Sequence, residues 1–349
     1  MLQIQVKSAL RAPTADVFSA RDKGTFDFMD KALERQLMAD ALFDVPYRAV
    51  ATTERPDLQV LVDTHSVFGV EVTEVFEHDS HARLLNIPNY LTHLASGGRA
   101  RHKDDLTELA VTAADSHTDK SSDSEGSGGG VTLTFSGTPQ HFDKIAVAVE
   151  SKSALCDTYE YVTHGFALVI ADHIPLLFDP TAKIPARMVL TPKLRRALFA
   201  SSFFEIYLLP TVLDEYPRTR LMLKAAALYE WACVASSVIA PAAKRHQLTK
   251  QEELSVWAGL ACPVRPRRLG VWLDTSRCRV YFGRTYLEIR PDGTFRSGQD
   301  FTESQGGAVP IWPRAVSQQE HVALAGAIER ALETETIETV LFHEIADSS

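Results

Sequence analysis

The stretch ERPDLQVLVDTHSVFGVEVTEVF, residues 54–76, decides how the fold of this chain is interpreted. It holds two apolar runs rich in Val and Leu, at 55–63 and 67–76, joined by the turn-like DTHS. Such runs favour strands, and a short polar connection between them is typical of a β-hairpin. Asp57 begins the first strand and Glu71 lies inside the second. The hairpin can therefore bring both carboxylates to one end of a small sheet.

Two neighbouring carboxylates repel each other unless a cation lies between them. Oxygen ligands of this kind suit Mg²⁺ or Mn²⁺ better than zinc. Side chains alternate between faces along a strand, so Glu71 and Thr73 share one face. A charge in the middle of an apolar strand needs a partner, because an unpaired buried charge is costly. We predict a metal site at Asp57 and Glu71, with Glu74 or Glu77 as alternatives to Glu71.

Helical and strand patterns alternate around this hairpin. A continuous apolar run at 165–173 is typical of a strand buried on both faces. Helices placed between such strands indicate an α/β protein with a mixed central sheet flanked by helices. The further strands are expected at 2–10, 131–137 and 203–213. The helices are expected at 26–43, 80–95 (interrupted near Pro88) and 141–161. The last of these helices should bury a stripe of apolar residues, Phe142, Ile145, Val149 and Leu155.

The rest of the chain divides into an insertion and a C-terminal region. Residues 97–130 are rich in Ser, Asp and Gly, which predicts a flexible insertion. After about residue 219 the pattern changes to an additional α+β region. We therefore expect a domain over 1–218 and a second region over 219–349. The second region should contain helices at 220–244, 249–261 and 318–334 and a β-meander at 269–297.

The net charge of −9 argues against a protein that coats nucleic acid without specificity. The charge is uneven, because residues 183–314 hold 20 Lys and Arg against 11 Asp and Glu, a net of +9. This asymmetry suggests an anionic partner for that segment, or acidic and basic parts that pack together. Its basic runs are KLRR (193–196), KRH (244–246) and RPRR (265–268). Its arginines at 277–296 interleave with Trp272, Tyr281, Phe282 and Tyr286, which suits a base-stacking surface or an ordinary solvated sheet face.

Three features predict a cytoplasmic protein. The N-terminus lacks a basic segment followed by an apolar block, so we expect no signal peptide. No apolar run approaches the roughly 20 residues that span a bilayer, so we expect no membrane partner. The four cysteines, Cys156, Cys233, Cys262 and Cys278, have no spacing typical of a disulfide framework or a zinc site.

The residues Pro56-Asp57, a following apolar strand and Gly69-Val70-Glu71-Val72-Thr73 resemble the core of the PD-(D/E)XK nucleases, the restriction-endonuclease-like superfamily. The order of elements over residues 26–213 is also similar: a helix with Glu34, two strands carrying the acids, a helix with lysines, and an apolar strand. One residue departs from the pattern, since the third motif position is Thr73 where the family usually has lysine. Members with a displaced lysine exist, which points to Lys152 or, less directly, Lys144.

The resemblance implies a Mg²⁺- or Mn²⁺-dependent nuclease that hydrolyses phosphodiester bonds, of DNA in preference to RNA, in repair, restriction or defence. It implies Asp57, Glu71 and the Val72 backbone carbonyl as metal ligands. Lys152 would orient water or offset phosphate charge, and Glu34 would bind a second ion or a metal water. Thr73 could hydrogen-bond a ligand water but cannot replace a cation.

The same residues are also compatible with a protein that is not a nuclease. Asp57 could simply start a strand, and Glu34 and Lys152 could be solvated surface residues. The chain could be an inactive nuclease-like binding or scaffold protein, in which Thr73 marks lost catalysis, or a small-molecule enzyme. The C-terminal region could serve a homodimer or a protein partner. The EHDSH segment, with His78 and His81, has the residue types of a metal site, but a solvated loop accounts for it better.

Overall fold

The computed structural model describes residues 3–7, 49–53, 56–61, 67–112, 130–134, 138–159, 162, 164–173, 187–210, 221–261, 269–274, 276–300, 313–334 and 337–340. The predicted helix at 26–43, with Glu34, lies outside these residues.

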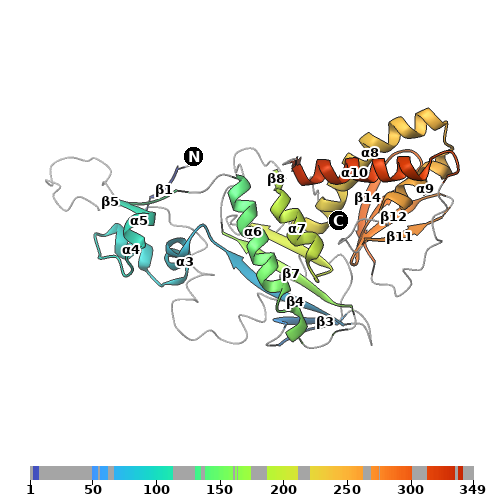
Figure 1. The fold of residues 1–349 in the computed structure, drawn as a ribbon. Helices are drawn as coiled ribbons and strands as arrows, with labels where there is room; N and C mark the ends of the chain where they lie inside the picture. Colours follow the sequence, from blue (N-terminus) through green and yellow to red (C-terminus); the bar gives the residue numbers. More distant parts are fainter. Residues whose placement is uncertain are drawn as a thin grey trace, which may run out of the picture.

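A six-stranded mixed sheet forms the centre of the molecule (Figure 1). The strand order is β10-β9-β7-β4-β3-β2, in which β4, β7 and β9 run parallel and the remaining neighbours pair antiparallel. The strands are β2 (Ala49–Thr52), β3 (Leu58–Leu61), β4 (Val67–Val75), β7 (Phe166–Asp172), β9 (Glu205–Pro210) and β10 (Leu221–Met222). The predicted hairpin is thus confirmed as β3 and β4, and the fold is α/β with a mixed sheet.

Strand β7 is buried along almost its whole length, as its continuous apolar sequence predicts. One face of the sheet packs under α6 (Thr138–Ser153) and α7 (Pro192–Ala200). Phe142, Ile145 and Val149 on α6 are fully buried there. The predicted fourth member of this stripe, Leu155, is 46% exposed, because α6 ends at Ser153 and a short 3-10 helix, η2 (Cys156–Thr158), follows.

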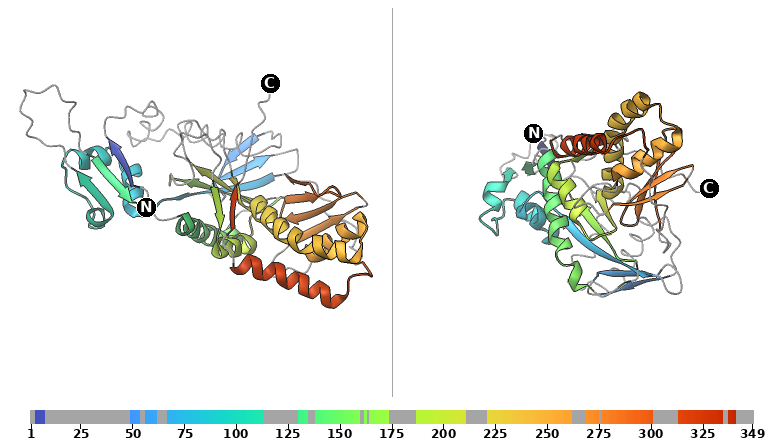
Figure 2. Two further views of the ribbon diagram at one scale, coloured as in Figure 1. Left: turned by 90° about the horizontal axis from the view of Figure 1, so that it is seen from above. Right: turned by 45° about the vertical axis from the view of Figure 1, so that its right-hand side comes forward.

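A smaller unit, formed by the elements between β4 and α6 in the sequence together with residues 3–7, lies at the opposite end of the molecule from the C-terminal region (Figure 2). It contains α3 (Asp79–Asn86), α4 (Tyr90–Ala95), α5 (Asp105–Glu108) and an antiparallel sheet ordered β1-β6-β5. These strands are β1 (Gln3–Lys7), β5 (Leu109–Thr112) and β6 (Gly130–Thr134). The predicted insertion at 97–130 therefore includes ordered elements, and residues 113–129 lie outside the described part.

A buried carboxylate explains why residues just after 97 are ordered. Asp105 is 1% exposed and accepts hydrogen bonds from Ser80 Oγ at 2.7 Å, from Arg83 Nη2 at 2.6 Å and from the Tyr90 hydroxyl. Burial alone would raise the pKa of Asp105, but these hydrogen bonds outweigh it and lower the pKa to about 2. The contacts of Asp105 therefore order the polar residues just after 97, although the composition of this segment predicts flexibility.

The C-terminal region has the elements that the sequence predicts. Helices α8 (Leu223–His246), α9 (Lys250–Ala261) and α10 (Gln318–Thr334) accompany a four-stranded antiparallel meander. Its strands are β11 (Leu269–Leu273), β12 (Cys278–Phe282), β13 (Thr285–Ile289) and β14 (Phe295–Gln299).

Helix α8 is long and apolar enough to cross a membrane, judged by length and composition alone. The expectation that no segment reaches that length does not hold for this helix. However, 56% of its most apolar window is buried inside the molecule, where Trp231 is fully buried. A helix that is apolar all round is typical of the centre of a core.

The regions on either side of residue 218 share one core. A single buried cluster extends from Val75 to Leu332. The last strand, β15 (Ile337–Val340), pairs with β8 (Arg187–Leu190) in a separate two-stranded sheet, and β10 pairs with β9. Backbone pairing and apolar packing therefore both cross the sequence boundary.

Candidate functional site

The β3–β4 register brings Asp57 and Glu71 to the same place. Leu58 pairs with Val70 at the end of the ladder, and the same register continued by one residue would set Asp57 opposite Glu71. Opposite residues of an antiparallel pair project from the same face, with their Cβ atoms typically about 5 Å apart. The Val72 backbone N–H donates to Asp57 Oδ2 at 2.8 Å, which fixes the aspartate at the point where β3 begins.

Helix α6 supplies the cation. Lys152 Nζ lies 2.6 Å from Glu71 Oε1. Lys144, two helical turns earlier, lies instead 2.6 Å from Glu77 Oε1. Of the two lysines that the sequence left open, Lys152 is the one that reaches the Asp57–Glu71 pair.

The Lys152 contact also explains how a carboxylate can lie inside an apolar strand. Glu71 is 7% exposed. Burial of an ionised carboxylate is costly unless a partner compensates it, and a charge-assisted hydrogen bond does so. The pair is not sealed from solvent, because the Lys152 side chain is 25% exposed. The Lys152 side chain therefore contacts the buried acid and is also partly open to solvent.

Tyr159 is a site residue that sequence reasoning did not single out. Burial raises its pKa, and the charges of Glu71 and, more weakly, Asp57 raise it further, so the phenol stays protonated. Its ring packs edge-on against Phe166, with the centroids 5.1 Å apart. The only signal in the sequence was a tyrosine shortly after the lysine-bearing helix. Its approach to the acids depends on the turn between α6 and β7.

Gly69 permits the close packing under the site. A Cβ atom at this position would lie 2.5 Å from Phe166 Cδ1 and 2.7 Å from Pro56 Cγ. Real Cβ contacts are not that short, so only glycine allows the Phe166 ring and Pro56 to approach β4 this closely. Pro56 precedes Asp57 and Phe166 supports Tyr159, so Gly69 helps to position both.

The remaining predicted residues are placed as follows. Val72 offers its N–H to Asp57 while its side chain packs with the apolar cluster on the other face of the sheet. The N–H and C=O of a strand residue point to the same edge, so the Val72 carbonyl faces the Asp57 side.

Thr73 is half-buried on the face of Glu71. Glu74, an alternative acid, is exposed and lies 3.2 Å from His173 Nε2. Glu34 lies outside the described residues.

The donor set fits a hard divalent ion with incomplete protein coordination. Among the described residues, no group of three or more His, Cys, Asp or Glu side chains could hold a metal. Mg²⁺ usually keeps several waters and takes one or two carboxylates together with substrate phosphates. Asp57, Glu71 and the Val72 carbonyl match that requirement. They do not provide the four nitrogen or sulfur ligands of a structural zinc site.

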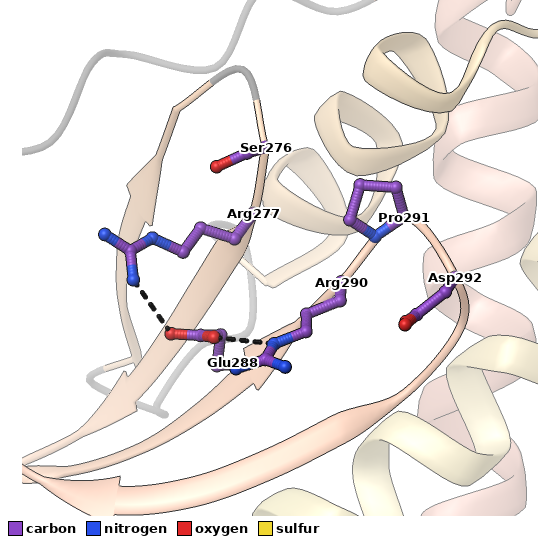
Figure 3. Close-up of a pocket in the computed structure, with 6 residues that line it drawn as sticks. All are labelled: Ser276, Arg277, Glu288, Arg290, Pro291 and Asp292. Atoms are coloured by element: carbon purple, nitrogen blue, oxygen red, sulfur yellow. Dashed lines mark hydrogen bonds and ion pairs between the residues drawn. The ribbon is translucent and has the colours of Figure 1, made fainter.

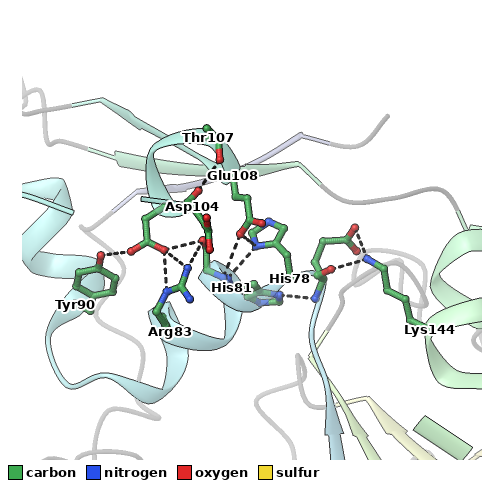
Figure 4. A network of polar contacts seen from close by, with 11 residues as sticks. His78, His81, Arg83, Tyr90, Asp104, Thr107, Glu108 and Lys144 are labelled. Atoms are coloured by element: carbon green, nitrogen blue, oxygen red, sulfur yellow. Dashed lines mark hydrogen bonds and ion pairs between the residues drawn. The ribbon is translucent and has the colours of Figure 1, made fainter. Parts of the chain in front are cut away.

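The histidines of EHDSH belong to a hydrogen-bond network (Figure 4). His78 caps α3 by accepting from the His81 N–H at 3.1 Å, and it lies 3.0 Å from Glu108 Oε2. His81 is 4% exposed and accepts from the Glu77 N–H at 3.2 Å. The solvated-loop interpretation is therefore wrong for His81. Burial, followed by the charges of His173 and His78, lowers the pKa of His81 to about 4.

The basic segments have several different environments. Arg195, from the KLRR run, is 2% exposed and binds Glu230 at 2.7 Å through Nε. Arg245 and His246 both contact Glu320. Arginines of the meander gather around Glu288 beside a shallow hollow (Figure 3). The RPRR run at 265–268 lies outside the described residues.

No family model, curated protein or solved structure matches this chain.

Proposed function

We propose that this protein is a metal-dependent nuclease of the PD-(D/E)XK type, with a restriction-endonuclease-like core formed by β2, β3, β4, α6 and β7. The observation that carries the proposal is the convergence of Asp57, Glu71 and Lys152. Lys152 Nζ lies 2.6 Å from Glu71 Oε1, and Asp57 is tied to the Val72 backbone at 2.8 Å. The antiparallel β2-β3-β4 meander followed by α6 and a strand parallel to β4 supports the same conclusion.

In this proposal Asp57, Glu71 and the Val72 carbonyl hold Mg²⁺ or Mn²⁺. The ion would supply Lewis-acid stabilisation of charge on the phosphate and would acidify a water. Lys152 uses one of its three N–H donors on Glu71, and another can orient the attacking water or contact a phosphate oxygen. Tyr159 remains protonated, and its buried hydroxyl, which has no hydrogen-bond partner among the described residues, is a donor available beside the acids. In the hydrolysis the water oxygen bonds to phosphorus, the bond to the leaving sugar oxygen breaks, and that oxygen takes a proton.

The substrate is DNA in preference to RNA, and the compartment is the reducing cytoplasm. Within the described residues Cys233 is an exposed free thiol, which supports a reducing environment. Repair, restriction and defence are the processes that use such an enzyme. The C-terminal region would then serve a second copy or a protein partner.

The test is cleavage of plasmid DNA and of RNA with Mg²⁺ or Mn²⁺. Asp57→Asn, Glu71→Gln and Lys152→Met should each lower the rate by at least about a hundredfold, because each removes a group that stabilises developing charge. Glu74→Gln on β4 and Glu150→Gln on α6 change exposed residues of the same strand and helix, and these controls should cleave like the wild type. Mn²⁺ binding measured without nucleic acid should weaken in the Asp57 and Glu71 variants alone.

Equal cleavage by all variants would reveal a contaminant and would refute the proposal. A specific alternative is an inactive nuclease-like binding protein, favoured by Thr73 at the position where the resemblance has lysine. Nucleic-acid binding without cleavage, in the presence of either ion, would establish that alternative.

A further inference from the structure

The meander β11–β14 has one apolar face and one face of aromatic and arginine side chains. Val271, Val280 and Leu287 share a register row and pack toward the core. The neighbouring row, on the opposite face, is Trp272, Arg279, Glu288 and Arg296. The next row on that same face is Gly270, Tyr281, Tyr286 and Gly298. We call the residues of these last two rows, with Arg277 and Arg290, the outer meander face.

Planar groups on this face stack on one another. The Arg279 guanidinium lies 4.5 Å from the centroid of the Tyr286 ring and 5.6 Å from that of Trp272. The Arg277 guanidinium lies 5.1 Å from the Trp272 centroid. Tyr286 in turn lies 5.6 Å from Tyr281, with the rings tilted by 52°. The result is an ordered row of π faces and guanidinium planes.

One buried acid on this face contacts three of the arginines, and Figure 3 shows its contacts with Arg277 and Arg290. Glu288 is 3% exposed and is contacted by Arg279 Nε at 2.9 Å, Arg290 Nε at 2.9 Å and Arg277 Nη1 at 3.4 Å. Burial alone would raise the pKa of Glu288, but these arginines outweigh it and lower the pKa. A guanidinium has five N–H donors, so each arginine keeps donors beyond those that Glu288 uses. Arg277 and Arg290 line the adjoining hollow with Ser276, Pro291 and Asp292.

The local sequence is also rich in positive charge. Residues 262–300 contain eight arginines, no lysine and four acids, a net of +4 in a chain whose net charge is −9. Arginine, unlike lysine, both stacks on planar rings and grips phosphate with two parallel hydrogen bonds. Single-stranded nucleic acid offers both partners, since its bases are unpaired and its phosphates are spaced along the strand.

We propose that the outer meander face binds single-stranded nucleic acid, with bases stacking at Trp272 and Tyr286 and phosphates held by Arg277 and Arg290. This surface is separate from the Asp57–Glu71 site. It depends on the proposed nuclease function only in that the bound strand would be the substrate of that site.

Binding is tested with fluorescein-labelled dT15 and rU15 in EDTA, followed by fluorescence anisotropy with the full-length protein. Arg277→Gln/Arg290→Gln should weaken binding by at least about tenfold and should reduce the salt slope by about 1.4, the value for two lost contacts to single-strand phosphates. Trp272→Ala should weaken binding by about tenfold, because one stacked base contributes about 1–3 kcal/mol. Among the described tryptophans, Trp231 and Trp257 are buried, so the part of the fluorescence quenching that Trp272→Phe removes reports binding at Trp272.

The matched control is Arg245→Gln/Arg330→Gln, which removes the same charge from exposed positions on α8 and α10. It should bind like the wild type. Equal weakening by this control, equal affinity for a duplex or for heparin, or no binding by the wild type would each overturn the proposal. Thermal unfolding confirms that the variants are folded.

Asp57→Asn/Glu71→Gln separates the two proposals. It should bind dT15 normally and fail to cleave. Trp272-dependent binding by a wild-type protein that never cleaves would leave this proposal standing and refute the nuclease. Cleavage without Trp272-dependent binding would refute this proposal and leave the nuclease proposal standing.

Discussion

At the scale of single residues, buried charge is the recurrent feature of this protein. Glu71, Asp105 and Glu288 are each less than a tenth exposed, and each has a cationic partner within 3 Å. Removing one member of such a pair leaves an uncompensated charge in a poorly solvated place, which costs more than the pair contributes. Glu71, the acid of the candidate site, is compensated by a cationic partner in the same way as Asp105 and Glu288. What distinguishes it is the neighbouring Asp57.

His81 gives a pH-dependent prediction at this scale. Its folded pKa of about 4 lies below the usual 6.5, so the unfolded chain binds the proton more readily between these values. Stability is therefore complete above pH 6.5 and is lost as the pH falls toward 4. Between pH 7 and pH 4.5 this residue should account for a loss of about 2 kcal/mol in the free energy of unfolding.

Urea unfolding at both pH values checks this expectation. His81→Asn keeps an acceptor for the Glu77 N–H but cannot be protonated. The free energy of unfolding of this variant should therefore fall by about 2 kcal/mol less than that of the wild type between pH 7 and pH 4.5. His102→Asn, at an exposed position, should behave like the wild type. An identical pH dependence in the wild type and His81→Asn would contradict the prediction.

At the scale of elements, β4 joins the site to the packing beneath it. Its pairing with β3 ends at Leu58 and Val70, directly beside Asp57 and Glu71, and its parallel pairing with β7 places it under α6. Gly69 lies two residues before Glu71 and admits Phe166 and Pro56. A change at this glycine therefore acts on the two elements that carry Asp57 and Tyr159.

Gly69→Ala should destabilise the protein by about 1–3 kcal/mol, because the added methyl group overpacks a filled space. Chemical denaturation measures this, and the cleavage rate should fall as well. Gly326→Ala is the matched control, since Gly326 lies inside α10 and its added Cβ meets only the end of the Arg330 side chain at 3.3 Å. That substitution should stabilise by about 0.5–1 kcal/mol. Destabilisation of both variants alike would contradict the packing argument.

At the scale of the whole molecule, one acid links the central sheet to the C-terminal region. Glu205 is fully buried at the start of β9. Its Oε1 accepts from the Lys224 N–H of α8 at 2.8 Å, and its Oε2 accepts from the Thr285 hydroxyl of β13 at 2.5 Å. Burial raises the pKa of Glu205, and burial lowers the pKa of Lys224 to about 7. The two regions are thus joined by polar contacts as well as by the shared apolar core.

Glu205→Ala should destabilise the molecule by about 3 kcal/mol or more, because it leaves several buried donors without an acceptor. Glu205→Gln keeps one acceptor oxygen and should cost less. Glu150→Ala, exposed on α6, should change stability by less than about 0.5 kcal/mol. Unfolding followed by tryptophan fluorescence and by circular dichroism should give coincident transitions. Separate transitions would show that the two regions unfold independently.

Periodicity in the amino-acid sequence was enough to predict most of the longer helices and strands. The β3–β4 hairpin, the buried strand β7, the helix carrying Lys152 and the C-terminal meander all came from patterns of apolar residues. The short strands β2, β8, β10 and β15 were not predicted, since two to four residues carry too little pattern. The neighbouring positions of Asp57 and Glu71 at the end of the β3–β4 ladder follow from a hairpin register that is set within one short segment.

Only the tertiary structure decided which lysine reaches the acids, that Tyr159 joins them, and that Arg195 is buried rather than on a basic surface. It also showed that residues on both sides of 218 form one core. These outcomes depend on how a helix turns over a sheet and on contacts between residues far apart in the chain. Local periodicity carries no information about such distances, because it records only which side of an element is apolar.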